Sequence, residues 1–171
     1  SRVLIPRPET ELLVEVALEQ PPGARVHDVG TGCGAVALAL RDERPDLVVS
    51  ASEASPEAVA VARANGLDAT LADGLPPGEY DLVLANLPYV REDEWAGLMP
   101  EIRLYEPRFA IVGGEDGLDP IRSMIAGAPR GTQVALEHAP GQADAVAGLL
   151  DDARSYPDLA GWGRLTVGRI P

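Results

Sequence analysis

Short apolar segments alternate with longer amphipathic segments along most of the chain. Apolar segments typical of buried strands cover residues 24–30, 47–53, 67–73, 80–86, 109–114, 132–138 and 163–170. Helical patterns cover residues 34–44, 55–66, 118–128 and 141–153. Strands that alternate with crossover helices form a parallel sheet covered on both faces. The pattern therefore predicts an α/β fold with a mostly parallel, seven-stranded sheet.

The first 22 residues precede this alternation. The stretch "PRPETELLVEVALEQPPG" predicts a loop followed by an amphipathic helix from about Glu9 to Glu19, which the prolines and glycine at its end would stop. The chain contains no internal repeat and no low-complexity linker, and its 171 residues suit one hydrophobic core. We therefore expect a single domain over residues 1–171, with residues 1–22 as a lead-in loop and helix.

The composition limits the cellular compartment and the classes of partner expected for this domain. No apolar run reaches the roughly 18 residues of a membrane span, and the start lacks a secretory signal. A single cysteine, Cys33, excludes a disulfide within the chain and favours a reducing cytoplasm. The 27 acidic and 14 basic residues give a net charge of −13, which makes nucleic acid an unlikely partner. The sequence suggests no membrane partner and no metal site.

A glycine-rich turn joins the first predicted strand to its helix. It comprises Gly30, Thr31, Gly32, Cys33 and Gly34. Glycines here permit a tight turn and let a ligand press against the main chain. Glu53, about 20 residues after the first glycine, follows the next strand, where a carboxylate binds ribose hydroxyls. The spacing predicts a nucleoside cofactor, although the same glycines would also suit a plain strand-to-helix turn.

The spacing G-x-G-x-G differs from the dinucleotide fingerprint G-x-G-x-x-G. It resembles the first motif of Rossmann-like class I S-adenosylmethionine-dependent methyltransferases. That resemblance implies that Asp28, which precedes the glycines, orients the methionine end of the cofactor. It also implies that Asp73 lies near the adenine amino group, with Gly74 and Leu75 beside the ring. Asp73 alone would equally suit an ordinary turn before a glycine.

The segment Asn86-Leu87-Pro88-Tyr89 follows the predicted strand at residues 80–86 and should face the reactive methyl group. A planar nitrogen is a poor nucleophile, so it must be held in line while acceptors draw on its hydrogens. The Asn86 side-chain oxygen and the Leu87 carbonyl are the expected acceptors, and Asn86 should also touch the cofactor. Pro88 would fix the backbone and Tyr89 would stack on the planar group. A strand that simply ends in an Asn-Pro turn has the same residue types.

Segments along nearly the whole chain resemble the catalytic domain of the protein-glutamine N(5)-methyltransferases that modify peptide chain release factors. They are "VLIPRPETELLVE", "DVGTGCGAVALAL", "ANLPYV", "YEPRFAIVGGEDGLD", "ALEHAPGQ" and "DLAGWGRLTVGR", in the family's order. The resemblance implies S-adenosyl-L-methionine as cofactor, S-adenosyl-L-homocysteine as product and a release-factor glutamine as substrate.

The resemblance also implies positions for further residues of these segments. It implies that Arg7 and Pro8, with Glu11 nearby, border the substrate, although "PRPETE" also fits a helix N-terminus with favourable acids. The loop beside the substrate would be shaped by Glu106, Pro107, Arg108, Gly113 and Gly114. A structural Arg–carboxylate pair would explain that stretch equally well. Glu137 and Gln142 match family positions without a derivable role, and His27 and His138 are expected to be structural.

Two departures from the family pattern leave alternatives open. Leu87 replaces the first proline of the usual Asn-Pro-Pro-Tyr, and the resulting tetrapeptide resembles that of ribosomal RNA adenine dimethyltransferases. The family's N-terminal helical domain is expected to be absent. The alternatives are methylation of an adenine or cytosine amino group in RNA or DNA, and a non-catalytic module that binds the cofactor or docks on a partner. The sequence predicts no oligomeric state.

Overall fold

A seven-stranded sheet forms the centre of the computed structural model, which describes residues 3–171. The strands are β1 (Arg25–Val29), β2 (Val48–Glu53), β3 (Thr70–Leu71), β4 (Leu82–Ala85), β5 (Gln133–Glu137), β6 (Asp151–Pro157) and β7 (Gly163–Arg169). Their order is β3-β2-β1-β4-β5-β7-β6. The first five run parallel, and β7 is antiparallel to both β5 and β6. The predicted mostly parallel, seven-stranded α/β fold is confirmed.

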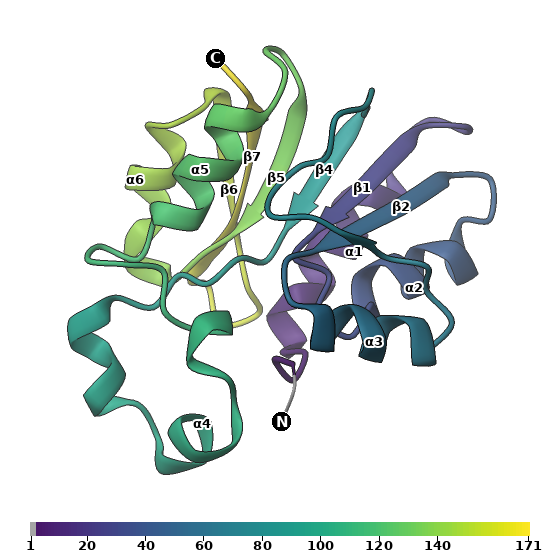
Figure 1. Ribbon diagram of the computed structural model, residues 1–171. Coiled ribbons are helices and arrows are strands. Elements are labelled where there is room, and N and C mark those ends of the chain that lie inside the picture. The colour runs from purple at the N-terminus through teal and green to yellow at the C-terminus, as the bar shows by residue number, and fades with distance from the viewer. Residues whose placement is uncertain (1–2) are drawn as a thin grey trace.

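Helices cover both faces of this sheet (Figure 1). The α-helices are α1 (Glu11–Leu18), α2 (Ala35–Glu43), α3 (Pro56–Ala64), α4 (Pro100–Tyr105), α5 (Asp119–Gly127) and α6 (Ala143–Ala147). Shorter 3-10 helices are η1 (Pro8–Thr10), η2 (Glu92–Gly97), η3 (Arg108–Ala110) and η4 (Pro140–Gln142). Helices α1, α2 and α3 pack on one face, and α5 and α6 on the other. None of the helices within residues 3–171 is long and apolar enough to cross a bilayer.

Strand β4 shows how the alternation builds two cores. Leu82 and Leu84 pack with α1 and α2, whereas Val83 and Ala85 pack with α5 and α6. All four side chains are buried, as expected for a central strand covered on both faces. A parallel sheet places the carboxyl ends of β1, β2, β4 and β5 at one edge, and the segments that follow these strands therefore meet there.

Two sequence-based assignments of secondary structure were wrong. Residues 109–114, predicted as a strand, form η3 and one isolated bridge between Val90 and Val112. Gly114, with φ of +96°, turns the chain directly afterwards and ends the pairing. The helix predicted over residues 141–153 ends at Ala147, and residues 151–157 form β6 instead. Because β6 is an edge strand with mostly exposed side chains, its pairing with β7, and not an apolar pattern, defines it.

Residues 91–117, which we call the α4 lobe, lie beside the carboxyl edge of the sheet (Figure 1). Their helices η2, α4 and η3 contribute no buried residue. Met99, Leu104, Tyr105 and Phe109 are large apolar side chains that are more than half exposed. The lobe therefore packs beside the two cores of the sheet without forming a core of its own.

Candidate active site

The turn after β1 lines a cavity of about 870 Å³, part of which is open to solvent. We call it the glycine-loop cavity; Gly30, Gly32, Glu53, Asp73 and Gly74 lie on its wall. Gly30 and Gly32 have φ of +70° and +57°, conformations that other residues adopt only at a cost. A Cβ atom on Gly30 would also lie 2.9 Å from the Leu87 side chain. The turn therefore needs glycine, and it exposes main chain to the cavity.

Glu53 holds the glycine turn from the neighbouring strand. Its Oε2 atom accepts a hydrogen bond from the Gly32 amide at 2.9 Å, and its Oε1 atom accepts one from the Ser55 amide at 2.9 Å. Each carboxylate oxygen can accept a further bond. Glu53 can thus fix the turn and still offer acceptors to a ligand in the cavity.

Asp28 lies behind the turn. Its carboxylate accepts a hydrogen bond from the Thr31 hydroxyl at 2.6 Å, and burial raises its pKa to about 7. Within residues 3–171, the wall of the glycine-loop cavity includes neither Asp28 nor four other expected cofactor residues, Thr31, Cys33, Gly34 and Leu75. Asp28 thus holds Thr31 behind the turn, and all five residues lie off the wall of this cavity.

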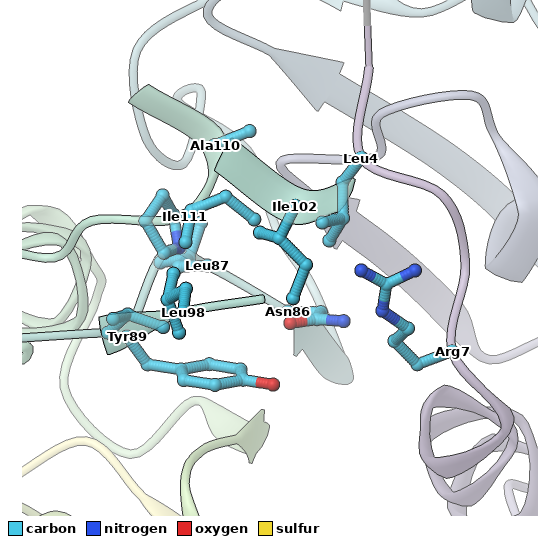
Figure 2. A pocket seen from close by; sticks show the side chains of 11 residues that line it. Leu4, Arg7, Asn86, Leu87, Tyr89, Leu98, Ile102, Ala110 and Ile111 are labelled. Atoms are coloured by element: carbon cyan, nitrogen blue, oxygen red, sulfur yellow. The ribbon is translucent and has the colours of Figure 1, made fainter. Parts of the chain in front are cut away.

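Asn86, Leu87 and Pro88 lie where the glycine-loop cavity meets a second cavity of about 470 Å³, which is also partly open to solvent. We call this second space the Tyr89 cavity (Figure 2). Its wall combines Arg7 and Tyr89 with apolar side chains, namely Leu4, Leu98, Ile102, Ala110 and Ile111. A ligand in each cavity would therefore meet the other across the Asn86-Leu87-Pro88 segment.

The Asn86 amide has a defined orientation. Its Nδ2 atom donates to the Thr10 hydroxyl oxygen at 3.1 Å. The side-chain oxygen accordingly points to the side of Tyr89, as Figure 2 shows. Within residues 3–171, no protein group donates to that oxygen or to the Leu87 carbonyl. The segment therefore presents two acceptors, while Thr10, which the sequence analysis missed, holds the amide nitrogen.

Tyr89 carries a hydroxyl group that stays protonated. It donates to Glu137 Oε1 at 3.5 Å, and burial, with the nearby Glu137 charge, raises the pKa of the phenol to about 12. The phenol is therefore unsuited to act as a base near neutral pH, and its ring and hydroxyl shape the cavity instead.

Two loops clamp the main chain of this segment. The Gly113 amide donates to the Val90 carbonyl at 2.8 Å, and Gln142 Nε2 donates to the Tyr89 carbonyl at 2.9 Å. A Cβ atom on Gly113 would lie 2.3 Å from the Pro88 oxygen, and one on Gly117 would lie 2.2 Å from the Tyr89 oxygen. Gln142 thereby gains a structural role that its sequence position did not reveal.

Only some of the other residues expected near the substrate line one of the two cavities. Arg7 lines the Tyr89 cavity and forms an ion pair with the buried carboxylate of Glu106. Pro8, Glu11, Pro107 and Arg108 line neither cavity; Arg108 pairs with Glu92. The "EPR" stretch therefore supplies structural Arg–carboxylate pairs, of which one lies at the cavity wall.

Both histidines are buried and fully bonded, as expected for structural residues. The ring nitrogens of His27 contact the hydroxyls of Ser50 and Ser52 at 2.8 and 3.0 Å. Those of His138 contact the Ala139 carbonyl at 2.9 Å and the Thr166 hydroxyl at 2.8 Å. Burial lowers the pKa of both, that of His27 to about 4. Neither ring lines the glycine-loop cavity or the second cavity described above.

Comparison with known proteins gives one consistent family. The family model of the methyltransferase small domain matches residues 8–99. The chain is 43% identical to the release factor glutamine methyltransferase of Cereibacter sphaeroides and 44% identical to that of Gloeobacter violaceus. These alignments cover 98% and 96% of this chain, and 67% and 66% of the relatives.

Solved structures agree with this result. The release factor-specific protein-(glutamine-N5) methyltransferase of Alicyclobacillus acidocaldarius is 30% identical, with a TM-score of 0.58 over 98% of this chain and 95% of that one. A 16S rRNA methyltransferase of T. thermophilus, in complex with AdoMet and guanosine, has a TM-score of 0.61 at 19% identity over 96% of this chain and 39% of that one, and so shares the fold. The chain spans about two thirds of the length of its curated relatives, and it belongs to the release factor glutamine methyltransferase family.

Proposed function

We propose that the protein transfers a methyl group from S-adenosyl-L-methionine to the side-chain amide nitrogen of a glutamine in a peptide chain release factor. The product cofactor is S-adenosyl-L-homocysteine. The observation that carries this proposal is the pair of acceptors, Asn86 Oδ1 and the Leu87 carbonyl, at the junction of the two cavities. The names of the curated relatives support the choice of glutamine in a release factor.

The residues of the glycine-loop cavity fit this cofactor. Glu53 would accept hydrogen bonds from the ribose hydroxyls, and the glycine turn leaves main chain open to the ligand. Asp73 and Gly74, on the same wall, would lie at the adenine, and Asn86 at the cofactor's other end. When bound, the cofactor supplies an electrophilic methyl group. We propose that Asp28 acts on the methionine end through the turn that it supports.

The Tyr89 cavity would hold the planar amide of the substrate. An amide NH2 group has two hydrogens, and Asn86 Oδ1 and the Leu87 carbonyl can accept one each. These acceptors stabilise the positive charge that develops on the nitrogen during transfer. The Tyr89 ring supplies a flat apolar surface beside them. The alkylated nitrogen loses its proton readily, so the site needs no strong base.

A nucleic-acid amino group would fit the same two acceptors, but the surroundings disfavour it. Among the described residues, Arg7 is the sole basic side chain on the wall of either cavity, and Glu106 neutralises it. The net charge of −13 also opposes binding to a phosphate backbone. We therefore prefer a protein substrate, and the single cysteine supports a cytoplasmic location.

Incubation with isotopically labelled S-adenosylmethionine tests this function. Release factors, tRNA, ribosomal RNA and DNA are offered separately, and mass spectrometry locates the label. We expect the label on the side-chain nitrogen of one release-factor glutamine, and much slower labelling with Asn86→Ala. Label on a nucleic-acid amino group alone would refute the proposal. Cofactor binding without transfer to any acceptor would favour the non-catalytic docking module.

A further inference from the structure

Asn86 and Tyr89, the two ends of the acceptor segment, are both connected by side-chain contacts to the buried carboxylate of Glu137. Asn86 Nδ2 donates to the Thr10 hydroxyl oxygen at 3.1 Å, and the Tyr89 hydroxyl donates to Glu137 Oε1 at 3.5 Å. The Thr10 hydroxyl lies close enough to Glu137 to lower the pKa of that carboxyl. Ala85 pairs with Leu136 in the parallel strands β4 and β5. Asn86 follows Ala85 and Glu137 follows Leu136, so these two residues lie side by side at the ends of the strands.

Thr10 is held firmly in its place. It is buried at the end of η1, and the following helix α1 buries Leu13 and Ala17 completely against the sheet. A hydroxyl group carries one proton, and Thr10 accepts from Asn86, so its own proton is available to the neighbouring carboxylate. Asn86 donates to Thr10, and the Thr10 hydroxyl lowers the pKa of Glu137, so the hydroxyl proton is directed toward the carboxylate.

Glu137 is an unusual residue for a core position. It is 2% exposed, and within residues 3–171 its Oε2 atom has no hydrogen-bond partner. Burial raises its pKa, and the Thr10 hydroxyl and the Arg164 charge oppose this effect. Arg164 also forms ion pairs with Glu9 and Asp158 at 3.2 and 3.5 Å, so its charge is shared. A buried carboxylate oxygen without a partner is costly, and among the described residues Glu137 shares this feature with Glu106.

We propose that Thr10 and Glu137 are positioning residues for methyl transfer, an inference that rests on the proposed function. Thr10 keeps the Asn86 oxygen turned toward the Tyr89 cavity. A rotated amide would present N–H groups to the substrate NH2 and would repel it. Glu137 fixes the hydroxyls of Thr10 and Tyr89 from behind and makes no contact with the substrate.

Replacement of Thr10 by Val and by Ser tests the direct contact. Thr10→Val keeps the shape but removes the acceptor for Asn86 Nδ2, so kcat should fall about 10- to 100-fold. Cofactor affinity should stay within about twofold, because Glu53 and the glycine turn are unchanged. Thr10→Ser restores the oxygen and should recover kcat to within about threefold. An unchanged kcat for Thr10→Val, or no recovery with Thr10→Ser, would overturn the inference.

Thr166→Val is the matched control. Thr166 is also a buried threonine, but its hydroxyl contacts His138 and Ser155 and does not contact Asn86. This variant should lower the melting temperature and leave kcat unchanged. Should Thr166→Val reduce kcat as strongly as Thr10→Val, the effect of Thr10 would be one of general stability and the inference would fail.

A double-mutant cycle isolates the route through Asn86. In an Asn86→Ala background Thr10→Val should change the single-turnover rate by less than about twofold, since the group that Thr10 holds is gone. Additive losses would show that Thr10 acts elsewhere.

Glu137→Gln keeps the size of the side chain and removes its charge, and it should reduce kcat about 3- to 10-fold without changing cofactor affinity. A fully active Glu137→Gln variant would remove Glu137 from the proposal.

A measurement that needs no activity separates this inference from the proposed function. In the 15N-labelled protein, the Asn86 side-chain NH2 resonances can be assigned by their loss in Asn86→Ala. We expect slowed hydrogen exchange for these protons in the wild type and fast exchange in Thr10→Val. Fast exchange in both would contradict the positioning role even if release-factor methylation were confirmed. Slowed exchange in a wild type that does not methylate release factors would refute the proposed function alone.

Discussion

The walls of the two cavities are built in different ways. The glycine-loop cavity takes Gly30, Gly32 and Glu53 from the ends of two adjacent strands, whose register fixes them. The Tyr89 cavity depends on contacts between distant segments: Thr10 and Asn86 are 76 residues apart, and Tyr89 and Gln142 are 53 apart. The strand register thus positions these three residues of the first wall, which Leu4, Phe109 and Ala110 complete from outside the sheet, whereas the second wall requires several loops to dock correctly. Changes in the loops should therefore damage acceptor binding and catalysis while cofactor binding survives.

Asn86→Ala should produce the largest difference between the effect on methyl transfer and the effect on cofactor binding. Removal of an acceptor that stabilises developing charge should reduce the single-turnover rate about 10²- to 10³-fold. Cofactor affinity, measured by calorimetry, should change less than about threefold, since Glu53 and the glycine turn remain. A fully active variant would refute the acceptor role, and a lost cofactor affinity would show that the two walls are not independent.

Gly113→Ala should disturb the Tyr89 wall through the backbone. Its Cβ atom would meet the Pro88 oxygen at 2.3 Å, so the acceptor segment must shift. A displacement of this kind should cost about 10²-fold in kcat, with cofactor affinity preserved. Gly127→Ala, where a Cβ atom meets nothing within 4 Å, is the control and should leave both quantities unchanged. Equal activity of the two variants would contradict the clamp.

Glu53→Ala probes the opposite wall. The loss of the carboxylate should weaken cofactor binding about 10- to 30-fold, because charge-assisted hydrogen bonds and the anchor of the Gly32 amide are removed together. At saturating cofactor, kcat should fall much less than in Asn86→Ala. Unchanged affinity by calorimetry would eliminate the proposed contact with the ribose.

The pH dependence of stability should give the smallest effect. The pKa of His27 is about 4 in the folded protein against the usual 6.5, so only the unfolded chain binds this proton as the pH falls from 6.5 to 4. For each pH unit within that window, His27 should therefore lower the melting temperature of the wild type by about 3–5 °C relative to His27→Gln. Asp28, whose pKa is raised to about 7, titrates in both proteins and cancels in the difference. A constant difference across the window would contradict the buried, neutral state of His27.

The sequence predicted which residues lie at the carboxyl ends of the strands better than it predicted the contacts that these residues make. Gly30, Gly32, Glu53 and Asn86 were found from local spacing and from the rule that parallel strands end at one edge. Their roles remain predictions, but the structure places all four on cavity walls. The position of Thr10 depends on the docking of η1 and α1 onto the sheet, which no local pattern encodes.

The two errors in secondary structure have the same origin. Residues 109–114 are apolar enough for a strand, but Gly113 and Gly114 turn the chain into the clamp on the acceptor segment. Strand β6 has no apolar alternation because it is an exposed edge, and only its pairing with β7 reveals it. In both places tertiary contacts override the local preference of the sequence.

A structure of the protein with S-adenosylhomocysteine and a glutamine-containing release-factor segment tests the central claim most directly. We predict that the glutamine NH2 lies within hydrogen-bond distance of Asn86 Oδ1 and the Leu87 carbonyl, with Asn86 Nδ2 still bonded to Thr10. A glutamine bound outside the Tyr89 cavity, or an Asn86 amide turned to present its nitrogen to the substrate, would contradict the account.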